Sequence, residues 1–182
     1  SDSSGTTFIF TDYLNKASEK WEKDGSVGKS IKWPMGLAGK GNAGVAGLVK
    51  QIKGSIGYLG SVYALQNKMP IASVENESNI FVKPSISSIS ESANVDLPKD
   101  SRFNISNTSA KNGYPISGLT WIIAYKKQNY DGRKIEDANK LKALLKWMVT
   151  DGQIYCEDLN YAPLTKNAQQ LALSIIDTIK FK

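Results

Sequence analysis

The stretch SDSSGTTFIFTDYL, residues 1–14, sets the interpretation of the whole chain. Hydroxyl residues and a glycine come first and apolar residues follow at once, an order typical of the start of a helix. From residue 7 onward, apolar side chains recur at the spacing of an amphipathic helix, at Phe10, Tyr13, Leu14, Ala17 and Trp21. The pattern predicts a helix over residues 7–24 that ends near Gly25.

Ser4, Gly5 and Thr6 lie where this helix would begin. The first backbone N–H groups of a helix have no partner within it, and the helix dipole is positive at this end, so helix starts attract anions. The hydroxyls of Ser4 and Thr6 add donors, and Gly5 lets a ligand approach the backbone closely. The residues alone leave two interpretations open: a binding cup for a tetrahedral oxyanion, and an ordinary N-cap built from residue types that cap helices anyway.

The composition of the 182 residues excludes several classes of function. The chain has no His, which removes Ser-His-Asp and Cys-His catalysis and the commonest nitrogen ligand for metals, so we expect no metal and no cofactor. Cys156, the one cysteine, cannot form an internal disulfide and fits a buried structural thiol within a helix. The net charge is +6, but the 23 lysines and arginines are scattered among acids, so we expect no nucleic-acid partner.

Patterns of helix and strand alternate along the rest of the chain. Helices are predicted near residues 45–52, 61–69 and 84–93, and strands at residues 55–60, 71–76, 80–83 and 119–126. The last strand, LTWIIAYK, is apolar enough to lie inside a sheet that is covered on both faces. Residues 94–115 are polar and irregular, which is typical of a loop.

Two or three further helices are predicted near the end of the chain, and the first and last of them each carry an apolar stripe. One stripe is Leu141, Leu144, Leu145, Met148 and Val149; the other is Ala168, Leu171, Ala172, Ile175, Ile176 and Ile179. We expect both stripes to face a sheet. The alternation of helices with buried strands predicts an α/β fold, with the binding site at loops that follow the strands.

Gly39, Gly41 and Gly44 match the G-x-G-x-x-G pattern of dinucleotide-binding loops. That fingerprint requires a strand directly before it and an acidic residue about 20 positions later, and neither is evident here. A nucleotide-dependent enzyme that uses this turn remains an alternative function. A glycine turn that begins a helix is the interpretation we favour.

Four blocks of the sequence, in order from end to end, carry a resemblance to a known family. They are SDSSGTTFIFTDYL at residues 1–14, WPMGLAGKGNAGVAGLVKQIKGSIGYLGSVYALQN at 33–67, YPISGLTWIIAYK at 114–126 and LKWMVTDGQIYCEDLNYAPL at 145–164. Together they resemble the phosphate-binding proteins of bacterial ABC phosphate-uptake transporters. The resemblance implies a type II periplasmic-binding-protein fold with two lobes that close around inorganic phosphate outside the cytoplasm and deliver it to membrane permease subunits. It also implies that the protein is not an enzyme.

The resemblance also implies roles for residues at the start of the chain. The family's pattern R-x-D-x-S-G-T puts phosphate donors on Ser4, Gly5 and Thr6, and on Asp2 the carboxylate that orients the arginine. That arginine would lie just before Ser1, so we expect the chain to be a carboxyl-terminal fragment with a partial fold. Residues 1–114 would belong to the second lobe, and residues 115–182 would return to the first. Sulfate and molybdate remain alternative ligands.

Overall fold

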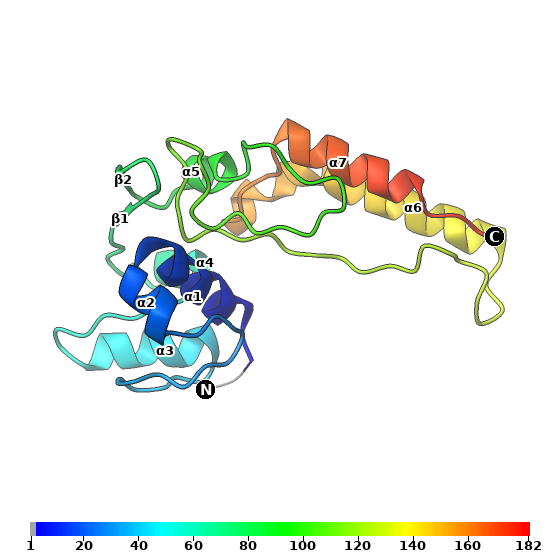
Figure 1. The fold of residues 1–182 in the computed structure, drawn as a ribbon. Helices are drawn as coiled ribbons and strands as arrows, with labels where there is room; N and C mark the ends of the chain where they lie inside the picture. Colours follow the sequence, from blue (N-terminus) through cyan, green and yellow to red (C-terminus); the bar gives the residue numbers. More distant parts are fainter. Residues whose placement is uncertain (1–2) are drawn as a thin grey trace.

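The computed structural model describes residues 3–182. In chain order the elements are α1 (Gly5–Ala17), α2 (Glu19–Asp24), α3 (Gly41–Gln51), α4 (Ser61–Gln66), β1 (Val74–Glu75), β2 (Phe81–Val82), α5 (Ile86–Glu91), α6 (Ile135–Val149), the 3₁₀ helices η1 (Asp151–Tyr155) and η2 (Glu157–Leu159), and α7 (Lys166–Asp177). The molecule is elongated, with α1–α4 at one end and the α6–α7 pair at the other (Figure 1). None of the helices in residues 3–182 combines the length and hydrophobicity that a membrane crossing needs.

The helix predicted over residues 7–24 is present as two helices, α1 and α2. Ser18 separates them because its backbone is extended and its hydroxyl accepts the N–H of Trp21 at 3.2 Å, which makes it the N-cap of α2. The second helix ends at Asp24, as predicted, and Gly25 follows it. A serine that can cap the next helix thus breaks a continuous apolar pattern.

An aromatic cluster holds α1 and α2 against the segments that follow them. The ring of Phe10 stacks on that of Tyr58 with centroids 4.4 Å apart, and Trp33 lies 5.6 Å from Tyr58. Trp21 of α2 lies 5.6 Å from Trp33. Contacts between aromatic rings stabilise a fold beyond the area that they bury, so this cluster fixes the orientation of α1.

The prediction of a strand at residues 55–60 is wrong. This segment is extended but pairs with no strand among the described residues, and Ile56 is 96% exposed. Side chains hold it instead: Asn42 of α3 accepts the N–H of Gly60 at 2.9 Å. An extended segment becomes a strand only when a neighbour satisfies its backbone, and none is available here.

The sheet in residues 3–182 is a single antiparallel pair of strands, β1 and β2, at the two predicted positions near residues 74 and 82. Asn76, 5% exposed, follows β1, and its side-chain oxygen accepts the N–H groups of Ser78 and Ile80 at 3.1 Å each. Its amide donates to the carbonyls of Lys111 at 2.9 Å and Gly113 at 3.2 Å. One buried asparagine therefore joins the hairpin to the predicted loop, which has no helix or strand from 94 to 115.

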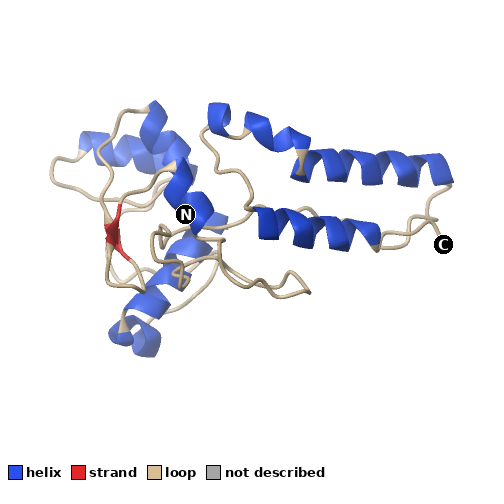
Figure 2. Ribbon diagram, turned by 90° about the horizontal axis from the view of Figure 1, so that it is seen from above, coloured by secondary structure: helices blue, strands red, loops and turns tan. Residues whose placement is uncertain are grey.

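Helices α6 and α7 form an antiparallel pair, seen as two neighbouring rods in Figure 2. Leu145, Ile176 and Ile179 are buried between them, with Leu141 and Val149 packed alongside. The two predicted apolar stripes thus face each other in part, while Leu144 and Met148 stay 52% and 37% exposed. The expectation that both stripes face a sheet is wrong for residues 3–182. The reason is that each stripe removes the other from water without any sheet.

A connection over residues 150–165, which contains the 3₁₀ helices η1 and η2, joins α6 to α7. Gln153 fixes it: its side chain donates to the carbonyl of Met148 at 2.6 Å and accepts the N–H of Leu164 at 2.8 Å. Cys156 lies between the two 3₁₀ helices, half-buried, with its Sγ 3.7 Å from the side-chain oxygen of Gln153. The expectation of a buried thiol in a helix is therefore corrected to a half-buried thiol in this connection.

The strand predicted for residues 119–126 is also not formed. Figure 1 draws this stretch in yellow-green as a single extended line that runs along the α6–α7 pair. Ile123 is 96% exposed and Tyr125 70% exposed. Strand-like pairing begins only beyond it, at an isolated parallel bridge between Lys127 and Lys180. This stretch has the apolar composition of a central strand, but residues 3–182 do not supply the neighbours that would make it one.

Candidate functional site

The first turn of α1 brings together Ser4, Gly5 and Thr6. Ser4 is the N-cap: its Oγ accepts the N–H of Thr7 at 3.4 Å, and its carbonyl accepts the N–H of Phe8 at 3.1 Å. The Ser4 N–H donates to the carbonyl of Lys29 at 2.8 Å. The hydroxyl of Ser4 accepts one hydrogen bond and can still donate its own proton, because a hydroxyl does both.

The amides of Gly5 and Thr6 point out of the helix start and remain open. Gly5 is exposed, Thr6 is half-buried, and a Cβ added to Gly5 would meet no atom within 4 Å. Among residues 3–182, neither N–H group makes a hydrogen bond, and nor does the Thr6 hydroxyl. Packing does not demand glycine at position 5, but glycine there leaves both amides uncovered. The turn presents uncovered donors at the positive end of a helix dipole.

Buried hydroxyls hold this turn in place from behind. The Oγ1 of Thr7 lies 2.9 Å from the Tyr58 hydroxyl, which comes from the segment that Asn42 also binds. Thr11 is fully buried; its Oγ1 donates to the carbonyl of Thr7 at 2.9 Å and accepts the N–H of Gly28 at 3.2 Å. The first turns of α1 and α3 are therefore fixed to one short segment, residues 58–60. Rigid support of this kind keeps donors in position before a ligand arrives.

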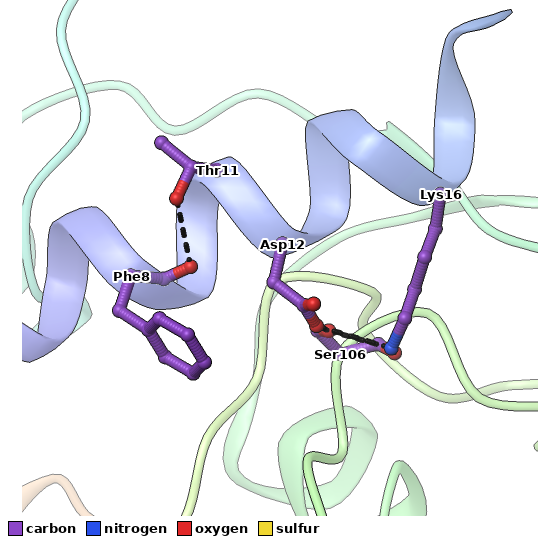
Figure 3. Close-up of polar contacts among 5 residues, drawn as sticks. All are labelled: Phe8, Thr11, Asp12, Lys16 and Ser106. Atoms are coloured by element: carbon purple, nitrogen blue, oxygen red, sulfur yellow. Dashed lines mark hydrogen bonds and ion pairs between the residues drawn. The ribbon is translucent and has the colours of Figure 1, made fainter. Parts of the chain in front are cut away.

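A second polar cluster on α1 was not predicted from the sequence (Figure 3). Asp12 and Lys16 form an ion pair of 3.0 Å, and the Lys16 ammonium donates to the carbonyl and hydroxyl oxygens of Ser106 at 2.9 and 3.1 Å. The Ser106 hydroxyl, in a residue that is 1% exposed, donates to the Asp12 carboxylate. The i,i+4 spacing of Asp12 and Lys16 is visible in the sequence. Ser106 is 90 residues away from Lys16, and only the fold brings it to the pair.

The glycines of the alternative nucleotide motif form the start of α3. A Cβ on Gly39 would lie 2.5 Å from the backbone nitrogen of Val45, and Gly41 has a φ of +61°, so both positions require glycine. Residues 31–40 contain no strand, whereas a dinucleotide fingerprint follows one directly. The packing of a loop onto the first turn of α3 accounts for these glycines.

Asp2, the remaining predicted site residue, lies outside the described residues. A cleft of 530 Å³ is found elsewhere, lined by Asn94, Val95, Asp96, Thr108, Ser109 and Asn167. None of the predicted phosphate donors lines that cleft, so the candidate site is an open surface of α1. The geometry described for α1 can hold one side of a small anion by hydrogen bonds from backbone and hydroxyl groups.

Comparison with known proteins identifies the family. A family model described as the PBP superfamily domain matches residues 1–152. The chain belongs to the PBP superfamily. The match runs from the start of the chain through α6 into η1, so it includes the candidate site. Membership confirms the predicted fold family, although the strands predicted at residues 55–60 and 119–126 are not formed in this chain.

Relatives of this PBP superfamily chain carry a consistent name. The phosphate-binding protein PstS of Xylella fastidiosa strain Temecula1 is 41% identical over 173 residues, which cover 92% of this chain and 46% of the relative. Its namesake in Pasteurella multocida is 35% identical over 173 residues, covering 93% and 49%, and that in Methanocaldococcus jannaschii is 33% identical over 196 residues, covering 99% and 50%. The resemblance to phosphate-binding proteins is thus confirmed, and none of the three names is that of an enzyme. The chain spans about half the length of the curated relatives that it matches.

Proposed function

We propose that this chain carries one wall of a cleft that binds inorganic phosphate, with the first turn of α1 as the anchor. The protein acts outside the cytoplasm as the solute-binding component of an ABC phosphate importer and passes phosphate to membrane permease subunits. It catalyses no reaction and binds no nucleic acid. The single observation that supports this most strongly is the pair of open amides at Gly5 and Thr6, in a chain 41% identical to a protein named as phosphate-binding.

The donors of this turn suit a tetrahedral anion. The N–H groups of Gly5 and Thr6 and the hydroxyls of Ser4 and Thr6 offer up to four hydrogen bonds at this turn. A hydrogen bond to a charged group contributes roughly 1.5–3 kcal/mol, so four of them can hold a phosphate if its remaining oxygens are also satisfied. Those oxygens face away from α1, so their donors must come from elsewhere. Asp2 would orient an arginine that contributes to the same site.

The two-lobe organisation is part of the same proposal. Residues 1–114 belong to the second lobe and carry the phosphate-binding turn, and residues 115–182 belong with the first lobe. Closure of the lobes would bring donors from both walls onto the anion and remove it from water. We therefore expect the chain by itself to bind phosphate weakly or not detectably, because it offers one wall.

Titration calorimetry with phosphate on two proteins tests this function. One protein is the 182-residue chain, and the other is a fusion in which this chain follows the first half of the Xylella fastidiosa relative. We expect tight binding only in the fusion, weakened by Ser4→Ala and by Thr6→Ala. Ser18→Ala is the matched control, since it removes the N-cap of α2 in the same way without touching the proposed site.

Three results would contradict the proposal. They are tight binding by the 182-residue chain, fusion variants at Ser4 and Thr6 that bind as well as Ser18→Ala does, and a fusion that prefers sulfate or molybdate to phosphate. The last result would keep the site and change its ligand. Circular dichroism of each variant separates a loss of binding from a loss of folding.

A further inference from the structure

Residues 25–74 contain lysines but no acidic side chain. Of the 23 lysines and arginines in the chain, six lie in this stretch, and the other 17 equal the 17 acids, so the stretch carries the whole net charge of +6. The mixing of lysines with acids in the rest of the chain therefore does not extend to it. The six are Lys29, Lys32, Lys40, Lys50, Lys53 and Lys68.

All six lysines are exposed, and their charges are not neutralised within the described structure. The ion pairs formed among residues 3–182 are Asp12–Lys16 and Lys146–Asp177, which both lie outside this stretch. An exposed cation without a counter-charge produces a positive potential in the solvent around it. The reach of that potential is about 10 Å at 0.1 M ionic strength. Figure 1 draws the stretch from blue to turquoise, at the end of the molecule that α1 and α2 occupy.

Two of the lysines lie near the first turn of α1. The carbonyl of Lys29 accepts the N–H of Ser4 at 2.8 Å, so the two backbones are in contact. Lys40 is the N-cap of α3, and the first turn of α3 is hydrogen-bonded to residues 58–60, as is the first turn of α1. Both lysines therefore add positive charge where the positive end of the α1 dipole is already uncovered.

The other end of α3 provides a comparison. The helix has 11 residues and is about 16 Å long at 1.5 Å per residue, and Lys50 and Lys53 lie at or beyond its end. That length exceeds the screening length at 0.1 M ionic strength. Asp12, the one acid on α1, is paired with Lys16 at 3.0 Å. The first turn of α1 thus lies close to Lys29 and Lys40, and its own helix offers no unpaired acid.

We propose that Lys29 and Lys40 attract phosphate from solution to the first turn of α1 and raise its rate of capture without contacting the bound anion. An anion that diffuses through a positive potential arrives more often, and charges at the rim of a site act mainly on the association rate and its salt dependence. The potential draws any small anion, so the choice among anions stays with the hydrogen bonds of the turn. This inference rests on the proposed function and adds the step that precedes binding.

The first experiment measures the potential on the 182-residue chain in phosphate-free buffer. NMR relaxation is recorded with an anionic and with an uncharged nitroxide probe, and the ratio of their effects at each amide reports the local excess of anions. At 0.1 M ionic strength we expect a ratio of roughly two at the amides of Gly5 and Thr6. Lys29→Met with Lys40→Met should remove at least about half of this excess. Lys50→Met with Lys53→Met, which removes the same charge at the far end of α3, is the control and should change the ratio by less than about a fifth.

The second experiment measures capture itself in the fusion protein described above. Stopped-flow mixing with phosphate gives the association and dissociation rate constants from tryptophan fluorescence. At 0.1 M ionic strength we expect Lys29→Met with Lys40→Met to lower the association rate constant roughly threefold, and the control pair to lower it less than about 1.5-fold. The difference should disappear at about 1 M ionic strength, where the screening length is about 3 Å. Dissociation should change less than about twofold in both pairs.

Four results would overturn the inference. They are a probe ratio near one at Gly5 and Thr6, equal effects of the two pairs of variants, an association rate that Lys29→Met and Lys40→Met leave unchanged, and a loss of affinity that lies mainly in faster dissociation. Equal effects would mean that only the net charge of the chain matters, and faster dissociation would mean that the lysines contact the bound anion. An unchanged association rate in a fusion that binds phosphate leaves the proposed function intact. A fusion that binds no phosphate contradicts the proposed function, and the probe ratio on the 182-residue chain then decides the inference.

Discussion

The α6–α7 pair and residues 119–126 are both strongly apolar, but only the helix pair finds its partner within the chain. An apolar stripe on a helix needs another apolar surface to leave water, and α7 supplies one for Leu141, Leu145 and Val149 of α6. The segment at 119–126 needs strands at its edges and cover on its faces, and residues 3–182 provide neither in full. Apart from its ends, a helix forms its backbone hydrogen bonds within itself and requires only packing. A strand requires neighbouring strands as well, because its backbone hydrogen bonds go to them.

The largest expected effect is a contrast in stability between these two regions. Leu145→Ala in the α6–α7 core should lower the free energy of unfolding by about 2–5 kcal/mol, because it leaves a cavity at a residue that is 7% exposed. Ile123→Ala should change it by less than about 0.5 kcal/mol, since that side chain is already in water. Urea denaturation followed by circular dichroism measures both. Equal losses would mean that residues 119–126 are packed in solution.

A second contrast concerns two threonines of α1. Thr11→Val should cost about 1–3 kcal/mol, because the part-buried N–H of Gly28 loses its acceptor and the buried carbonyl of Thr7 loses a donor. Thr6→Val should cost less than about 0.5 kcal/mol, since the Thr6 hydroxyl has no partner in the described structure. Thermal and urea unfolding of the two variants test this. A large loss for Thr6→Val would show that position 6 serves stability and not a ligand.

The polar cluster on α1 should make a smaller contribution. Lys16→Met removes the ammonium that joins Asp12 to Ser106 and should cost about 1 kcal/mol, because this pair is only partly exposed. Lys20→Met on α2, at an exposed position, is the control and should cost less than about 0.5 kcal/mol. The difference between the two variants should shrink as NaCl is added during urea unfolding. A difference that does not respond to salt would indicate lost packing of the lysine stem.

The smallest expected effect is a pH dependence at the α6–α7 pair. The hydrogen bond and charge of Lys146, 2.7 Å away, hold the pKa of Asp177 below its ordinary value. A depressed pKa means that the contribution to stability is present above the unfolded pKa and is lost as the pH falls through the folded pKa. Lys146→Met should therefore differ from the unmodified chain at pH 7 and converge with it in acid, whereas Lys140→Met should show no such trend. Because Asp177 is exposed, a large effect at pH 7 would contradict the assignment.

Sequence patterns predicted the helices well, because the residues that hydrogen-bond within a helix lie close together along the chain. The apolar stripes located α6 and α7, and the patterns near residues 45–52, 61–69 and 84–93 correspond to α3, α4 and α5. The break at Ser18 was missed because a capping serine in mid-pattern looks like any other polar residue. The short strands β1 and β2 were placed correctly, since a hairpin joins neighbours in sequence.

For the candidate site, the sequence located the donors but not the scaffold behind them. The order Ser-Gly-Thr before an apolar run predicted a helix start at these residues, and the structure makes Ser4 its N-cap. The supporting bonds of Thr7 to Tyr58 and of Lys16 to Ser106 join residues 51 and 90 positions apart. A local sequence pattern cannot indicate pairs of residues that lie so far apart in the chain. The roles of Ser4, Gly5 and Thr6 as phosphate ligands stay a prediction.

The sequence by itself determined the superfamily, the positions of most helices and the Ser-Gly-Thr start of α1, because each depends on the local order of residues. Only the tertiary structure decided that the stripes of α6 and α7 bury each other, that Ser106 completes the cluster on α1, and that residues 119–126 remain open. The physical reason is that a helix forms from hydrogen bonds within one segment, whereas a sheet, a buried polar cluster and a core depend on which distant segments meet.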